Sequence, residues 1–158
     1  MLDRLNPKKI IVVSSAPQIR YPDCYGIDMA KIQNFIAFRA TLKLHEDMGT
    51  LDQILDKIYE GCIRSLTISL EKVENQVKAL YEPFTDQQIS DKIASILKGK
   101  IIKSDVEIIF QTIDGLHKAC PENSGDWYFS GNYPTPGGNR VVNRAFMNYY
   151  EGKSVRAY

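Results

Sequence analysis

A short apolar run near the start of the chain constrains its fold more than any other feature. Residues 10–13 read Ile-Ile-Val-Val and are followed by Ser-Ser-Ala and by Pro17. An unbroken apolar run that ends in small residues and a proline is typical of a strand buried in a parallel sheet. Such a strand needs other strands at its edges and helices over its faces. We therefore expect an α/β fold, with a second strand at residues 106–110.

The loop after the first strand, residues 17–28, is the expected site of ligand binding, because ligands of open α/β sheets bind beyond the carboxyl ends of the strands. Three of its residues, Arg20, Tyr25 and Asp28, are the candidate substrate-binding residues. The guanidinium of Arg20 is suited to an anionic oxygen, and Tyr25 or Asp28 would shape the pocket. The structural alternative is that Tyr25 packs in the core and Asp28 caps the following helix.

Helical periodicity divides the chain into three parts. Residues 1–40 are expected to hold the strand, the loop and a helix over residues 29–40. Residues 41–104 are expected to form an inserted helical subdomain, and residues 105–158 a strand, a helix and a C-terminal tail with a last helix over residues 139–150. The predicted fold is therefore helix-rich overall, with an incomplete parallel sheet.

Within the insertion, apolar stripes predict helices over residues 51–60, 65–81 and 86–98. Gly61 is expected to end the first of these helices. Thr85 and Gln88, three residues apart, have the form of a capping box for the last one. An insertion of this kind most simply serves packing or oligomerisation, with a regulatory role as the alternative.

Two blocks of the sequence carry a family resemblance. Residues 14–28 read SSAPQIRYPDCYGID, and residues 108–116 and 127–135 read IIFQTIDGL and WYFSGNYPT. Together and in this order they resemble the C-terminal portion of the phosphoribosyltransferase domain of glutamine phosphoribosylpyrophosphate amidotransferases (amidophosphoribosyltransferases). These stretches lie in two blocks, residues 9–29 and 106–135, which together span roughly a third of the chain. The resemblance implies a type I phosphoribosyltransferase-like sheet and an anionic phosphoribosyl substrate near Arg20.

By the same resemblance, the intact enzyme belongs to de novo purine biosynthesis. It transfers glutamine-derived ammonia to phosphoribosyl pyrophosphate, giving phosphoribosylamine, with Mg²⁺ on the pyrophosphate. Family members carry an N-terminal cysteine nucleophile and an Asp-Asp-Ser-type substrate loop, and this sequence has neither. We therefore expect a C-terminal fragment that holds no catalytic residue and is not catalytically complete alone. Its expected partner is the missing N-terminal portion or a second copy of the chain; the alternative is a stand-alone, non-catalytic interaction or oligomerisation module.

Metal binding and cysteine chemistry are not expected in this chain. Some family members hold an iron–sulfur cluster through cysteines, and the matching positions here are Asp23, Gly125 and Tyr128. Four converging thiolates are needed for such a cluster, so none is expected, and no other cofactor is expected either. Cys24 has no histidine close in sequence to activate it, which favours an inert thiol.

Composition sets the remaining expectations. A net charge of +1 provides no field to attract nucleic acid. No apolar run approaches the roughly 20 residues of a membrane span, so no membrane partner is expected. Three widely spaced cysteines, an odd number, indicate reduced thiols, and the expected location is therefore cytoplasmic.

Overall fold

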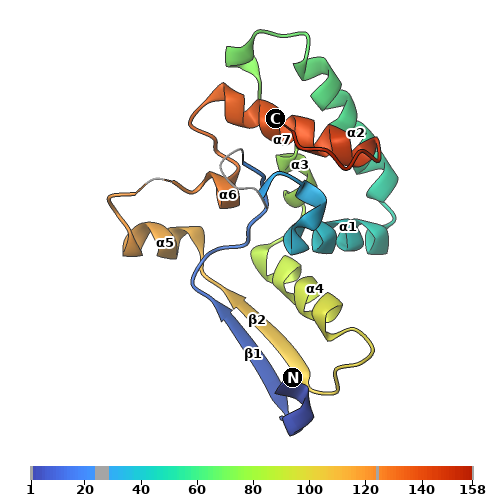
Figure 1. The fold of residues 1–158 in the computed structure, drawn as a ribbon, viewed down its shortest axis with the longest axis vertical. Coiled ribbons are helices and arrows are strands. Elements are labelled where there is room, and N and C mark those ends of the chain that lie inside the picture. Colours follow the sequence, from blue (N-terminus) through green and yellow to red (C-terminus); the bar gives the residue numbers. More distant parts are fainter. Residues whose placement is uncertain (1, 24–28, 124, 158) are drawn as a thin grey trace.

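The computed structural model describes residues 2–23, 29–123 and 125–157. It is an α/β structure rich in helix, with a two-stranded parallel sheet at one end and most of the helices toward the other (Figure 1). The strands are β1 (Lys9–Ser14) and β2 (Asp105–Phe110). The α-helices are α1 (Ile36–Met48), α2 (Leu51–Ser65), α3 (Lys78–Tyr81), α4 (Asp86–Lys98), α5 (Ile113–Ala119), α6 (Trp127–Ser130) and α7 (Pro136–Tyr150). Single 3-10 turns occupy Leu2–Leu5, Ile32–Asn34 and Leu70–Lys72.

The parallel pairing of the two strands confirms the expected α/β class. The register runs from Lys9 opposite Asp105 to Ser14 opposite Phe110, although 90 residues separate the strands in sequence. Helix α4 packs against β2 (Figure 1), and Ile108 points to this covered side, where it is only 6% exposed.

The opposite face of the sheet is uncovered within the described residues. Side chains alternate between faces along a strand, so Ile11, Val13 and Ile109 share the face opposite Ile108. They are 52%, 71% and 45% exposed. Lys9 and Glu107 form an ion pair across the same two strands. A parallel strand that exposes most of an aliphatic side chain is unusual, because parallel sheets are normally covered on both faces.

A single hydrophobic core lies among the helices. Helix α1 packs against α4 and α2, and α7 packs against α2. The largest fully buried apolar side chains come from all of these elements and from the segments beside them: Ile32, Phe38, Ile58, Val77, Leu80, Ile89, Ile93, Val142 and Phe146. The core also reaches the sheet through Ile108. The helices therefore form the stable body that carries the sheet.

Helix α1 differs from the helix expected over residues 29–40. It begins later, at Ile36, and continues to Met48, where Gly49 adopts the left-handed conformation with a φ of 67°. Phe38, Thr41 and His45 are buried along one side, so the apolar stripe runs past residue 40. The expected division between residues 40 and 41 therefore falls within a continuous helix.

The helix expected over residues 65–81 is wrong. The hydroxyls of Ser65 and Thr67 donate to carbonyls of the last turn of α2, and only a 3-10 turn and the short α3 follow. The Asn75 side chain accepts from the backbone N–H of Val77, a local bond that competes with helix formation. Val73, Val77 and Leu80 are still buried. Their spacing therefore indicated correctly that these side chains contact the core, although the backbone between them is not a continuous helix.

Gly61 does not end α2, which continues to Ser65. Gly61 lies within the helix and is buried, and a Cβ there would come within 2.6 Å of the Gln76 side chain. The glycine thus provides room for the neighbouring segment and is not a helix stop signal.

Other local expectations are confirmed. The capping box is present, because Thr85 Oγ1 accepts from Gln88 N while the Gln88 side chain accepts from Thr85 N. Helix α7 begins three residues earlier than expected, after Thr135, whose side chain accepts from Gly138 N. None of the helices in the described part of the chain is long and apolar enough to cross a membrane.

Candidate functional site

The candidate site lies where both strands end. Gln111 N donates to Ser14 O at 3.1 Å, extending the strand pairing by one bond. Beyond it, Ser14 Oγ donates to Ala16 O at 2.9 Å and turns the chain away from the sheet. A cavity of about 310 Å³ opens here and is lined mainly by apolar side chains, among them Pro17, Ile19, Met29, Phe35, Ile36 and Phe110. Its lining suits an apolar group and offers little to a phosphate.

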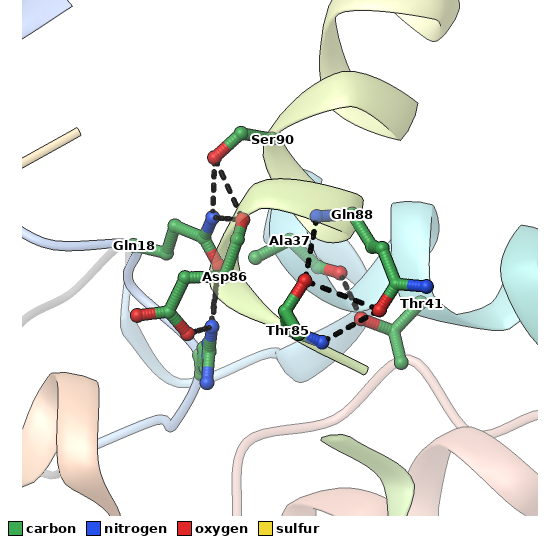
Figure 2. A network of polar contacts seen from close by, with 8 residues as sticks. Gln18, Ala37, Thr41, Thr85, Asp86, Gln88 and Ser90 are labelled. Atoms are coloured by element: carbon green, nitrogen blue, oxygen red, sulfur yellow. Dashed lines mark hydrogen bonds and ion pairs between the residues drawn. The ribbon is translucent and has the colours of Figure 1, made fainter. Parts of the chain in front are cut away.

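A buried glutamine organises the loop beside this cavity (Figure 2). Gln18 is 4% exposed, and its Nε2 donates to Ser90 Oγ and to Asp86 O, both at 2.8 Å. Ser90 Oγ in turn donates to Asp86 O. The loop after β1 is therefore tied to the first turns of α4, which the Thr85 capping box holds in place.

The structure places Arg20, the first candidate substrate-binding residue, in this same network. Its Nη2 lies 2.7 Å from Gln18 Oε1 and 2.5 Å from Asp86 Oδ1. Its guanidinium carbon lies 5.3 Å from the centre of the Tyr81 ring. The side chain is only 14% exposed. Arg20 thus holds the loop against α4 and Tyr81, and a ligand anion would have to compete with the Asp86 carboxylate for it.

The other two candidates, Tyr25 and Asp28, lie outside the described residues, as does Cys24. Of the three candidates, Arg20 is the one that lies among the described residues. Sequence reasoning missed Gln18, Asp86 and Ser90. The sequence places Asp86 at the start of a helix, directly after the capping Thr85. Nothing in the sequence connects Asp86 with Gln18.

The two sequence blocks that carry the family resemblance contact each other. The backbone N–H groups of Arg20 and Tyr21 donate to Tyr128 O at 2.9 and 3.1 Å. Trp127 Nε1 donates to Asp23 Oδ2 at 2.6 Å. The Tyr133 hydroxyl donates to Pro22 O. Residues 20–23 are thus held by residues 127–133, which lie more than 100 positions later in the chain.

Gly131 makes part of this contact possible. It ends α6 with a φ of 71°, in the left-handed region that favours glycine. A Cβ at this position would also lie 2.8 Å from the Tyr21 ring and 2.7 Å from Asn75 Nδ2. The glycine of the WYFSGNYPT block is therefore required both for its backbone conformation and for the packing of Tyr21.

Two buried tyrosines, Tyr21 and Tyr81, support the loop after β1. The Tyr21 and Tyr81 rings meet edge to face, with centroids 5.3 Å apart. The Tyr81 hydroxyl donates to Arg20 O at 2.9 Å. Burial raises the pKa of both phenols well above the ordinary value, and for Tyr81 the neighbouring Tyr21 adds to this effect. Both side chains therefore stay neutral at physiological pH and support the loop as hydrogen-bonding apolar groups.

A second cavity, of about 520 Å³, is polar and lies between the segment around α3 and the loop after α6. The Lys78 ammonium donates to Asn132 Oδ1, and Asn75 Nδ2 donates to Gly131 O at 3.1 Å. Both side chains thus bond across the cavity, one to the Asn132 side chain and one to the Gly131 backbone. They join the 73–82 segment to the WYFSGNYPT block and thereby support the same loop.

The part of the chain that the structure describes contains no group of three or more His, Cys, Asp or Glu side chains that could hold a metal ion. Asp23 accepts from Trp127, and Cys62 is buried with its pKa raised to about 12 by burial. His117 Nε2 lies 3.1 Å from Asp126 Oδ2 at the exposed surface. The Ser130 hydroxyl donates to the other carboxylate oxygen of Asp126 at 2.9 Å. The contact between Asp23 and Trp127 anchors the loop.

Comparison with models of protein families, with curated proteins and with solved structures gave no match.

Proposed function

We propose that this chain is a C-terminal portion of the phosphoribosyltransferase domain of an amidophosphoribosyltransferase-like enzyme. The observation that carries the proposal is the parallel sheet with one uncovered apolar face. A sheet of this type needs further strands and a covering layer, which the rest of a larger α/β domain would provide. The contact between the two resembling blocks supports the same proposal, since both belong to one loop system at the strand ends.

In the intact enzyme, glutamine-derived ammonia would be transferred to phosphoribosyl pyrophosphate in the first committed step of purine synthesis. This portion would contribute two strands, the loop at their carboxyl ends and the helical body. Arg20 would act there as a positioning residue, because its guanidinium already pairs with Asp86. By the resemblance, Mg²⁺ would accompany the pyrophosphate in the intact enzyme.

A stand-alone, non-catalytic interaction or oligomerisation module is the second candidate. The engagement of Arg20 by Gln18 and Asp86 favours it, because the one described candidate for substrate binding is already paired within the chain. In this case the uncovered face of β1 and β2 would be the interaction surface.

The mass of the native polypeptide distinguishes the two. Trypsin cleaves after Lys9 and Arg20, so the peptide of residues 10–20 can be followed through a size separation of denatured extract from the source organism. We expect this peptide in a band several times heavier than 18.0 kDa. Its recovery only at 18.0 kDa would reject the enzyme proposal and favour the module.

Ligand binding provides a second test on the isolated chain. Detectable binding of phosphoribosyl pyrophosphate with Mg²⁺ by the isolated chain would support the enzyme proposal. Stable self-association of the isolated chain without binding of that ligand would support the module instead.

A further inference from the structure

We propose that a groove between α2 and α7 binds a small amphiphilic carboxylate, with the apolar tail in the groove and the carboxylate between Arg140 and Arg144. The groove has a volume of about 300 Å³. It lies in the helical body, and Figure 1 shows α2 and α7 at the end away from the strands. The inference therefore does not rest on the function proposed for the strand ends.

The walls of the groove are mainly apolar. Leu66, directly after α2, forms one side and is 48% exposed. Val141 and Met147 of α7 form the other side, and Ala157 of the C-terminal tail closes one end. The tail is held in place there, since Lys153 N donates to Asn148 O at 2.7 Å and Asn148 Nδ2 donates to Arg156 O at 3.3 Å.

The groove also carries two positively charged side chains, those of Arg140 and Arg144. Arg140 and Arg144 are one turn apart on α7, so their side chains share one side of the helix. Both are exposed, and neither forms an ion pair with any residue that the structure describes. Arg144 is among the positive charges that lower the pKa of Glu151, but the Glu151 carboxylate itself bonds to Lys153 Nζ at 2.5 Å and to the Tyr59 hydroxyl at 2.9 Å.

Charge complementarity decides which occupant fits. An apolar groove with two adjacent guanidinium groups favours a molecule with an apolar body and an anionic head, and a carboxylate matches arginine geometry well. Two other polar side chains line the groove, Ser65 and Asn143, and they are 6% and 2% exposed. Ser65 Oγ donates to Cys62 O at 2.6 Å. Asn143 is bonded as well. Its Nδ2 donates to Glu74 O at 2.8 Å and its Oδ1 accepts from Gln76 N at 3.0 Å. Recognition of the head group therefore falls to the two arginines.

Size argues for a small molecule as the occupant. A volume of about 300 Å³ is at the lower end of small-ligand pockets. An amphipathic helix of a partner protein would need a longer groove that takes side chains from two or more turns. A linear carboxylic acid of medium chain length fills such a space with its tail and leaves its head at the rim.

The test uses octanoate as the probe and 1-octanol as its uncharged match, with binding measured by calorimetry and by NMR shifts of the Met147 methyl group. We expect saturable octanoate binding that shifts Met147, with octanol at least tenfold weaker. The variant R140Q/R144Q should lose at least tenfold in octanoate affinity, while R4Q/R39Q, which removes two exposed arginines elsewhere, should bind as the unaltered chain does. Thermal unfolding confirms that each variant is folded.

Four outcomes would overturn the proposal. The first two are octanoate affinity that is unchanged in R140Q/R144Q and octanoate affinity equal to that of octanol. The third is loss of binding in I11S/V13S, which would place the probe on the uncovered sheet face. A second groove variant, L66N, keeps the charges and removes apolar contact, and it should also weaken octanoate binding; unchanged affinity there would equally contradict the groove.

Discussion

The side-chain amide of Gln18 donates to Ser90 Oγ at 2.8 Å, joining residues that lie 72 positions apart in the sequence. Gln18 follows the first strand, and Ser90 lies in the second turn of α4. Since α4 also covers one face of the sheet, this bond fixes the loop at the strand ends to the element that supports the strands.

Replacing Gln18 by methionine should destabilise the fold. The variant Q18M keeps the side-chain volume but removes the two bonds that Nε2 donates and the buried Oε1 acceptor of Arg20. We expect the free energy of unfolding to fall by about 1–3 kcal/mol, the usual penalty for an unsatisfied buried group. Urea denaturation measures it. The control Q87M alters an exposed glutamine of the same helix and should change stability by less than about 0.5 kcal/mol; equal effects of the two variants would contradict the role given to Gln18.

The two histidines should differ in their contributions to stability. His45 is 3% exposed, and its ring nitrogens lie 2.9 Å from Thr50 Oγ1 and 2.8 Å from Leu80 O. Since a carbonyl only accepts, Nε2 donates to Leu80 O and Nδ1 accepts from the threonine hydroxyl. The variant H45L should lower the free energy of unfolding by about 1–3 kcal/mol. H117L, at the exposed surface, should lie within about 0.5 kcal/mol of the unaltered chain. A small effect of H45L in the same denaturation series would show that the buried bonds contribute little.

Polar substitutions on the two faces of the sheet should differ in their effect on the free energy of unfolding. I108T places a hydroxyl on the side covered by α4 and should cost about 1–3 kcal/mol of stability. V13T alters a side chain that is 71% exposed, so it should leave stability within about 0.5 kcal/mol and reduce association of the isolated chain. Denaturation and static light scattering check both statements. If V13T destabilises the chain as strongly as I108T does, the face around Val13 is covered in solution by the chain itself or by a second copy.

Cys62 and Cys120 should react with thiol reagents at very different rates. Burial raises the pKa of the Cys62 thiol to about 12, and the side chain is fully buried, so it is protonated and inaccessible at pH 8. Cys120 is exposed. In a C24S background, we expect one thiol to react with a disulfide reagent in the native state and the second only after denaturation. Rapid modification of both thiols at pH 8 would mean that the α2 face around Cys62 opens readily.

Stability should fall at alkaline pH. Burial raises the pKa of Tyr21 and Tyr81 in the folded state, while in the unfolded chain they ionise near pH 10. Above that pH the unfolded state releases protons that the folded state keeps, so the free energy of unfolding decreases as pH rises. The variant Y81F should show a shallower decrease, although it loses the hydrogen bond to Arg20 O and starts from a lower stability at pH 7. Denaturation at several pH values between 9 and 11 measures the slopes; identical slopes would contradict the assignment of Tyr81.

Sequence patterns alone were sufficient for features that depend on near neighbours. The apolar run of β1, the strand at β2, the Thr85 capping box and the helix after Thr112 could all be predicted. In each case the signal and its cause lie within a few residues, because strand periodicity and helix caps are local. A parallel sheet was expected as well, but the pairing of these two strands with each other and its register came only from the structure.

Tertiary contacts decided the rest. Arg20 was expected to face a ligand anion, and only the folded chain shows that Asp86, 66 residues later, already pairs with it. The spacing of Val73, Val77 and Leu80 was interpreted as a helix, yet long-range bonds such as Asn143 to Glu74 O hold this segment as turns. Periodicity records which side chains are buried, but it does not record the backbone path that buries them or the partners they meet. Those depend on which distant segments pack together, and that is determined by the free energy of the whole fold.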